Sequence, residues 1–353
     1  MAKQRRLNKG QIRRVRANQQ KRLDQAGLEP ETTADTVGGP EAGIVISRFG
    51  QQAIIATADD SPMRCHIRRT VESLVCGDEV VWRRLDPSSA EDVGGVIEAV
   101  QPRRSLLSRP DYYDGLKPVA ANVDQILIIS SLLPAFSTQI IDRYLVACED
   151  IEVTPVIVLN KADLMTELSP EEQAQVDTAL QMYQDIGYQV LKVSAKEING
   201  LKPLRDVLQD NVSIVVGQSG VGKSSLVNAL LPEIDASVGA ISGGSGLGQH
   251  TTTVATRYPL PDGGVLIDSP GIREFALWHL EPDRVAWCFR DFRPFLGQCK
   301  FRDCKHVDDP GCALQQAVVD GDLHELRLYN FHRIIESMSL KKPSRATAKG
   351  SKT

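Results

Sequence analysis

The sequence of 353 residues lacks any long hydrophobic run, and its N-terminus carries no apolar signal segment. A bilayer-spanning helix needs roughly 20 consecutive apolar residues, so we expect no membrane span and no membrane partner. The charged N-terminus argues against a conventional secretory route and favours a cytoplasmic protein. No internal repeat is present. At roughly 100–200 residues per domain, the length predicts two or three domains.

The sequence also lacks the cysteine pattern of a disulfide-bonded protein. It has seven cysteines, an odd number, and no secretory signal, so a disulfide framework is not expected. Three of the cysteines and one histidine lie together within residues 299–312. In a reducing compartment, such a cluster more often binds a metal ion than forms a disulfide bond.

Acidic residues are absent from both ends of the chain. Residues 1–22 contain nine Lys or Arg, and residues 341–353 contain five. The segment 23–340 contains the other 27 basic residues and all 45 acidic ones, a net charge of −18. The overall charge of −4 is therefore an average over an acidic body and two basic tails. We expect residues 1–39 to form a mobile arm, because no apolar face in them repeats well enough to be buried.

Residues 40–106 consist of short β-type segments, which are separated by turn residues at intervals of roughly ten residues. Five such segments, GIVISRF, QAIIAT, RCHIRR, GDEVVWRRL and GGVIEAVQP, predict a small barrel; any other small antiparallel sheet is the alternative. Exposed arginines of this module either bind nucleic acid or form a solvated face. They are Arg64, Arg68, Arg69, Arg83 and Arg84.

From residue 107 to 275, continuous apolar runs alternate with amphipathic stretches. The runs are 123–130, 154–160, 188–194, 211–217 and 263–268, and the amphipathic stretches between them include 139–150, 170–186 and 223–231. Buried strands separated by helices predict a parallel sheet with helices on both faces, an α/β domain. In residues 276–340 the strands stop, and the Cys/His cluster and a helix near 313–338 follow.

A phosphate-binding loop lies between the strand SIVV and the helix SSLVNALL. The octapeptide Gly217-Gln218-Ser219-Gly220-Val221-Gly222-Lys223-Ser224 fits G-x-x-x-x-G-K-[ST], and strand–loop–helix is the context that supports such a match. Backbone N–H groups and the helix dipole would hold the β-phosphate, and Lys223 would bridge the β- and γ-phosphates. Ser224 would bind Mg²⁺, and Ser225 completes the predicted nucleotide contacts.

Guanine selectivity is predicted by two further motifs. Asn160-Lys161-Ala162-Asp163 follows an apolar strand, and its aspartate can accept hydrogen bonds from the guanine N1–H and amino group, a pair that adenine does not offer. Ser194-Ala195-Lys196 would contact the guanine edge after the next strand. Asp268-Ser269-Pro270-Gly271 fits the D-x-x-G that contacts Mg²⁺ and the γ-phosphate, and Thr252 is the expected Mg²⁺-ligating switch threonine.

The order of these motifs is unusual. Ordinary small GTPases have the phosphate loop first, whereas here N-K-x-D and S-A-K precede it. The sequence thus resembles the circularly permuted GTPases, in which permutation leaves the site intact when the old termini lie close together. In this order, the chain runs from D-x-x-G directly into the cysteine cluster.

The cluster Cys299-x₄-Cys304-x-His306-x₅-Cys312 supplies three thiolates and one imidazole, a complete tetrahedral set for one structural Zn²⁺. Reduced, unliganded thiols are the alternative. Cys288 is not required by this set.

The combination of GQSGVGKSSLVNALL, GLGQHTTT, DSPGIREF and CKFRDCKHVDDPGCAL resembles the bacterial RsgA family of ribosome-biogenesis GTPases over about residues 40–340. The resemblance implies an OB-fold at 40–106, a circularly permuted GTPase domain at 107–275 and a zinc-binding domain at 276–340, flanked by the arm and the basic tail. It also implies GTP and GDP as ligands, and the 30S subunit with its 16S rRNA as partner. The family acts late in subunit maturation, with subunit-stimulated hydrolysis, and we expect a monomer.

The usual catalytic glutamine is missing. The residue after D-x-x-G is Ile272, which cannot orient water. His250, in a glycine-rich loop, is the candidate that the family resemblance supports; an exposed loop histidine is the alternative. Two other functions remain open, namely a GTP-gated RNA chaperone in which hydrolysis only resets binding, and a metabolic P-loop enzyme, which N-K-x-D disfavours.

Overall fold

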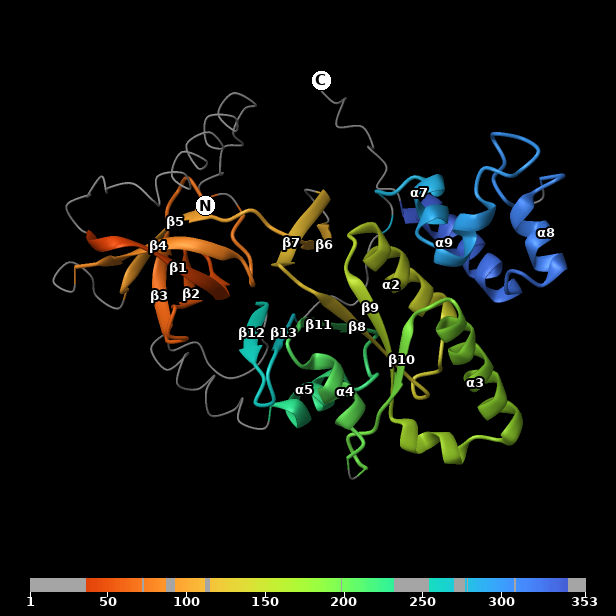
Figure 1. Cartoon of the computed structure of the whole chain (residues 1–353), viewed down its shortest axis with the longest axis horizontal. Helices are drawn as coiled ribbons and strands as arrows, with labels where there is room; N and C mark the ends of the chain where they lie inside the picture. The colour runs from red at the N-terminus through yellow and green to blue at the C-terminus, as the bar shows by residue number, and fades with distance from the viewer. Residues whose placement is uncertain are drawn as a thin grey trace, which may run out of the picture. The chain divides into compact units, whose positions relative to one another are not determined.

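The computed structural model describes residues 36–71, 73–86, 93–111, 115–197, 199–231, 254–269, 277, 279–307 and 309–341 (Figure 1). No helix within these residues has both the length and the apolar character that a membrane span requires. The described chain divides into two compact units. One contains the residues up to 125 with 205–215 and 224–272, and the other contains 126–204, 216–223 and 273 onward.

The first unit begins with a closed barrel, which confirms the predicted fold of this module and rules out an open sheet. Its strand order is β1-β2-β3-β5-β4. A parallel pairing between β3 and β5 closes the barrel. Alternating side chains such as Val45, Ile55, Trp82 and Ile97 fill its interior. The strands are β1 Thr36–Phe49, β2 Gln52–Ala56, β3 Pro62–Ile67, β4 Glu79–Leu85 and β5 Gly95–Val100.

Strand β1 is longer than the sequence pattern predicts. It starts at Thr36, opposite Leu85, inside the segment expected to be a mobile arm. Its register shifts between Val37 and Glu41, where Gly38 has a φ of +85°. This irregularity accommodates the glycine–proline stretch that otherwise argues against a strand.

The five arginines of the barrel differ in exposure: Arg69 and Arg84 are exposed, Arg64 and Arg68 are half-buried, and Arg83 alone among them is buried. Arg83 is only 8% exposed and binds Glu98 at 3.1 Å. Arg68 binds the same carboxylate at 2.6 Å, and Arg84 binds Glu41 at 2.8 Å. Arg83 is therefore a buried structural cation, and the expectation that it is exposed was wrong.

A six-stranded sheet follows, with the order β10-β9-β8-β11-β13-β12. The pairs β9–β10 and β11–β13 are parallel, as expected for an α/β domain. The edge strand β12 is antiparallel and was not predicted, because it has four residues, is half-exposed and ends in proline. The strands are β8 Gln125–Ser131, β9 Thr154–Asn160, β10 Gln189–Lys192, β11 Val212–Gly217, β12 Thr256–Pro259 and β13 Val265–Asp268.

The predicted helices of this region are present. They are α2 Thr138–Asp150, α3 Pro170–Asp185 and α5 Lys223–Leu230. The short helices η1 Ala162–Glu167 and α4 Lys202–Leu208 and a hairpin of β6 Leu106–Asp111 and β7 Gly115–Ala121 were not predicted. Helix α3 starts with a capping box, in which Ser169 and Glu172 satisfy each other's backbone N–H groups.

The C-terminal part of the second unit is helical. It contains α7 Pro282–Trp287, η2 Arg290–Phe295, α8 Ala313–Asp320 and α9 Glu325–Lys341. The prediction of one helix near 313–338 was wrong. Helix α8 ends at Asp320, because the next residue, Gly321, has a left-handed φ of +83°, and α9 begins at Glu325. The rings of Phe289 and Phe292 pack against each other and against Phe331 of α9, with centroids 4.6–5.7 Å apart.

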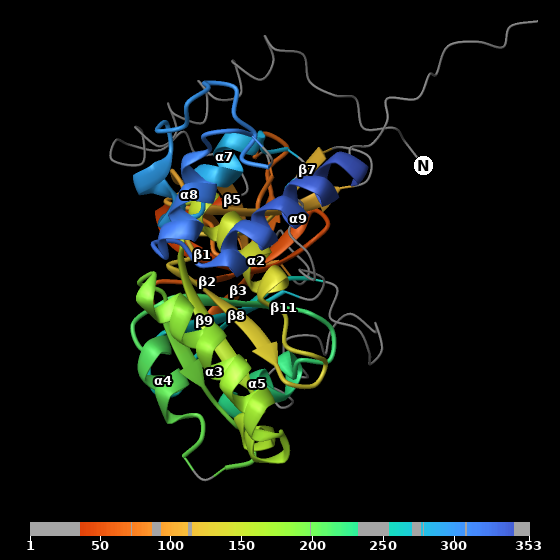
Figure 2. The ribbon, with the colours of Figure 1, turned by 90° about the vertical axis from the view of Figure 1, so that its right-hand side faces the viewer.

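Helix α9 packs against α2, the helix that follows β8 (Figure 2), and a buried polar network joins the two helices. Arg327 is 1% exposed and binds both oxygens of Asp291, at 2.8 and 2.9 Å, and the fully buried Asp142. Asp142 also accepts hydrogen bonds from Tyr183 and Asn330, at 2.8 and 2.6 Å. Burial lowers the pKa of Arg327, but the two carboxylates more than offset this effect, so its pKa lies well above the ordinary value. The guanidinium therefore stays charged inside the protein.

We expect Arg327→Met to destabilise the protein by about 3–5 kcal/mol, because the substitution leaves Asp142 as an uncompensated buried charge. The matched control is Arg333→Met on the same helix, which removes only an exposed pair with Glu336 and should cost no more than about 1 kcal/mol. Urea unfolding followed by circular dichroism measures both. Equal midpoints for the two variants would contradict the assignment.

Candidate functional site

The N-K-x-D loop begins where β9 ends, and its first residue contacts the phosphate loop. Asn160 is 3% exposed, and its Nδ2 donates to the carbonyl of Val221 at 2.9 Å. Its Oδ1 is buried and has no hydrogen-bond partner among the described residues. The side chain thus ties two motifs together that lie far apart in the sequence.

Lys161 crosses between two backbone segments. Its φ of +60° turns the chain sharply, and its Nζ donates to the carbonyls of Gly220, at 2.9 Å, and Leu133, at 2.6 Å. Ser131 donates its hydroxyl to the same Leu133 carbonyl at 2.9 Å. The loop after β8 is therefore part of the site, a role that sequence reasoning missed; the proline that follows this buried strand was the available signal.

The third element, Asp163, is held by the S-A-K segment. Ser194 donates its hydroxyl to Asp163 Oδ1 at 2.7 Å, and Lys196 Nζ lies 3.5 Å from Oδ2. The hydrogen bond from Ser194, followed by the charge of Lys196, lowers the pKa of Asp163, so this carboxylate is ionised at neutral pH. The backbone of Ala162 is fixed by its N–H, which donates to Val193 at 3.0 Å.

The phosphate loop has the tight geometry that its glycines require. Gly222 has a φ of +92°, and a Cβ atom there would lie 2.4 Å from Asn160 Nδ2. Lys223 turns its Nζ into the loop, where it donates to the carbonyls of Gly217 and Gln218 at 2.6 and 2.5 Å. Its ammonium group is thus held among the backbone groups that would surround a phosphate. Ser224 and Ser225 are exposed on the first turn of α5.

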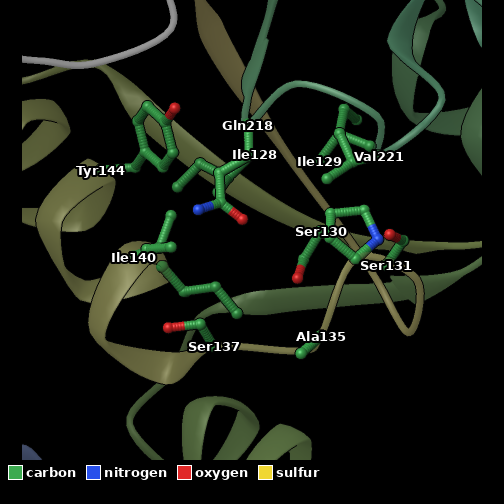
Figure 3. Close-up of a pocket in the computed structure, with 12 residues that line it drawn as sticks. Ile128, Ile129, Ser130, Ser131, Ala135, Ser137, Ile140, Tyr144, Gln218 and Val221 are labelled. Carbon is green, nitrogen blue, oxygen red and sulfur yellow. The ribbon is translucent and has the colours of Figure 1, made fainter.

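A small pocket lies beside this loop (Figure 3). The side chain of Gln218 points into it from the phosphate loop, opposite Ile140 and Tyr144 of α2. Ser137, which precedes α2, lies at its rim, and it makes no side-chain capping bond. The start of α2 and the phosphate loop therefore share one pocket.

The remaining nucleotide motif is only partly described. Asp268 ends β13, which pairs with β11, the strand that leads into the phosphate loop. Gly271, Ile272, His250 and the threonines 251–253 lie outside the described residues. The assignments of His250 to catalysis and of Thr252 to Mg²⁺ therefore stay predictions.

The four predicted metal ligands converge. The sulfurs of Cys299, Cys304 and Cys312 lie 3.5, 3.5 and 3.4 Å from His306 Nδ1, and all four ligand atoms lie within 4.8 Å of one another. Zn–S and Zn–N bonds of about 2.3 and 2.0–2.1 Å in a tetrahedron place neighbouring ligand atoms about 3.5 Å apart. The residues therefore fit a tetrahedral metal ion, and Cys288 is not part of the cluster.

Burial, together with the neighbouring thiols, raises the pKa of Cys304 to about 12, a shift that a bound cation would oppose, whereas two other features of the cluster suit metal ligation. Burial lowers the pKa of His306, which keeps its imidazole neutral. The N–H of Ala313 donates to the Cys299 sulfur at 3.4 Å from the first turn of α8. A helix N-terminus stabilises a thiolate, so this contact supports metal binding.

Comparison with known proteins agrees with these sites. The RsgA GTPase family model matches residues 100–278. A Shewanella oneidensis protein named small ribosomal subunit biogenesis GTPase RsgA is 57% identical over 349 residues, 98% of each chain. A Vibrio vulnificus protein named small ribosomal subunit biogenesis GTPase RsgA 1 is 54% identical and covers 100% of this chain and 99% of its own.

Two solved structures are similar along most of the chain. YjeQ from Thermotoga maritima has a TM-score of 0.67 and 30% identity, and covers 86% of this chain and 100% of its own. YloQ, described as a circularly permuted GTPase, also has a TM-score of 0.67, with 27% identity, and covers 86% of this chain and 96% of its own. The motif order and these similarities lead to one conclusion: the chain belongs to the RsgA GTPase family of circularly permuted, GTP-hydrolysing enzymes.

Proposed function

We propose that this enzyme hydrolyses GTP to GDP and phosphate while it assists late maturation of the 30S ribosomal subunit, and that the subunit stimulates turnover. The observation that carries the GTP-binding part is the joining of Asn160, Lys161 and the phosphate loop by hydrogen bonds. The names of the Shewanella and Vibrio relatives support the ribosomal part. This partner implies work in the cytoplasm, on 16S rRNA, and we expect a monomer.

The nucleotide would bind along the ends of β9 and β11. Asp163 would accept hydrogen bonds from the guanine N1–H and amino group, and the backbone of Ser194-Ala195-Lys196 would contact the guanine edge. The backbone amides from Gly217 to Ser225 would bind the phosphates, and Lys223 would exchange its carbonyl partners for phosphate oxygens.

The hydrolysis machinery would be completed by residues on both sides of the phosphate loop. Ser224 and Thr252 would hold Mg²⁺, which supplies charge neutralisation at the β- and γ-phosphates. Asp268 would approach the ion through water, and the Gly271 N–H would contact the γ-phosphate. His250 would orient the attacking water, because Ile272 offers no hydrogen-bonding group.

The cysteine cluster would hold one structural zinc ion. Cys299, Cys304, His306 and Cys312 fill all four tetrahedral positions, which leaves none for substrate. The metal would therefore stabilise the C-terminal fold rather than take part in hydrolysis.

Asp163→Asn should weaken GTP binding about 100-fold, because the amide leaves one of two guanine donors unpaired and adds a donor of its own. Binding of xanthosine triphosphate, whose 2-oxo group accepts a hydrogen bond, should improve. Titration with fluorescent nucleotide analogues measures both affinities. Asp177→Asn on α3, an exposed partner of Lys192, is the control and should change neither.

GTP turnover should be slow for the isolated enzyme and should rise on addition of 30S subunits. In His250→Ala, GTP binding should persist, while stimulated turnover should fall by about 100-fold or more, the range for loss of a group that positions water or transfers a proton. Phosphate release with and without subunits measures this. Full stimulation of the variant would exclude His250, whereas subunits that raise only affinity would favour a GTP-gated chaperone.

Deletion of residues 1–22, with their nine basic residues, should lower affinity for the 30S subunit and flatten its dependence on salt. The reason is that each Lys or Arg bound to a phosphate releases a counterion. Sedimentation with subunits at several salt concentrations measures the slope. GTP affinity should stay unchanged, because the predicted nucleotide-binding motifs lie between residues 160 and 271. If the deletion variant bound the 30S subunit as tightly as wild type, the arm would have no role in binding and would serve only as a solubilising tail.

A further inference from the structure

The metal ligand His306 has an unusual backbone. Its φ of +59° lies in the left-handed region, which only a few per cent of non-glycine residues adopt. Such a conformation is strained and persists only where surrounding contacts impose it. The position of Nδ1 relative to the three thiols depends on this backbone, so the contacts that hold it also hold the metal-binding geometry.

Two side chains make these contacts. Asp309 Oδ2 accepts hydrogen bonds from the N–H groups of Lys305, at 2.9 Å, and Val307, at 3.4 Å, on either side of His306. His332 Nε2 lies 2.5 Å from the carbonyl oxygen of His306, to which its N–H donates. Asp309 belongs to the same loop, whereas His332 reaches it from helix α9.

Helix α9 is anchored independently of the cluster. Arg327 and Asn330 bind Asp142 of α2, and Arg143 of α2 donates to Ser337 at 2.9 Å. The ring of Phe331 meets that of His306 edge to face, with centroids 6.3 Å apart. One face of α9 is thus fixed to the helix that follows β8, while His332 holds the peptide of a metal ligand.

We propose that His332 is a positioning residue for the metal centre, which holds His306 in its ligating conformation and fastens the metal site to α9 and α2. The inference rests on the proposed metal binding. Groups that orient a ligand without touching the metal change metal affinity by about 10–100-fold when they are removed. His332 contacts the backbone carbonyl of His306 and not its ring. The ring nitrogen Nδ1 of His306 therefore remains directed at the three thiols.

The first test is the rate at which the full-length chain, purified with zinc, transfers the metal to a chromophoric chelator at neutral pH. His332→Met, which keeps volume but removes the donor, should release zinc about 10-fold faster. His332→Gln, whose amide N–H can replace Nε2–H, should return the rate toward that of wild type. Arg333→Met, the neighbouring residue on α9 with an exposed side chain, should release zinc at the wild-type rate.

The outcomes separate the two proposals. A wild-type chain that holds no zinc after purification contradicts the metal site itself and this inference with it. A chain that holds one zinc ion, with His332→Met releasing it at the wild-type rate, overturns only the positioning role. Fast release by both His332→Met and His332→Gln shows that ring packing matters and not the donated hydrogen bond, and also overturns it.

A second measurement tests the connection to α9, and its comparison of wild type with His332→Gln remains available even if His332→Met, its third variant, folds poorly. Removal of zinc from either should increase amide hydrogen exchange in α9 as well as in residues 299–312. In His332→Met, the increase should stay within 299–312. Exchange in wild-type α9 that is insensitive to zinc would contradict the connection.

Discussion

The nucleotide site depends on one hydrogen bond, from the buried amide of Asn160 to the carbonyl of Val221. It joins the N-K-x-D loop to the phosphate loop, although N-K-x-D precedes the phosphate loop in this chain and follows it in ordinary small GTPases. The bond requires close approach, which is why Gly222 cannot carry a side chain. Lys161 strengthens the same junction through Gly220. The fold tolerates circular permutation because these contacts join loops at the ends of neighbouring strands. The positions of the strand ends in the sheet do not depend on the order in which the chain connects the strands.

The sequence predicted those parts of the fold whose signals are local. The phosphate loop, N-K-x-D and the cysteine spacing each occupy a few adjacent residues at the end of a strand or before a helix. The barrel and the helices α2, α3 and α5 likewise follow from periodicity and turn residues. The length of strand β1 was underestimated, because the irregularity at Gly38 resembles a loop in the sequence. One helix was predicted near 313–338 because the left-handed turn at Gly321 was missed, and that glycine was its only signal.

Contacts between distant residues could not be predicted. Nothing in the sequence around Asp142 indicates that Arg327 neutralises it, and His332 lies well outside the spacing of the metal ligands. Arg83 was expected to be one of the exposed arginines of the barrel, yet it is buried and pairs with Glu98 of the neighbouring strand β5. A charged side chain whose partner comes from another element looks the same in a sequence as a solvated one, and only the tertiary structure distinguishes them.

Helix α9 contacts residues that lie far from it in the sequence, and this distance has a consequence for folding. The metal ligands enclose loops of at most fourteen residues, which close at little entropic cost, whereas Arg327 and Asp142 are 185 residues apart. During synthesis, α2 leaves the ribosome long before α9 has been made. Until then, the carboxylate of Asp142 and the apolar face of α2 lack the residues of α9 that cover them in the folded protein. The face of α2 that carries Asp142 can therefore finish packing only after α9 has been made.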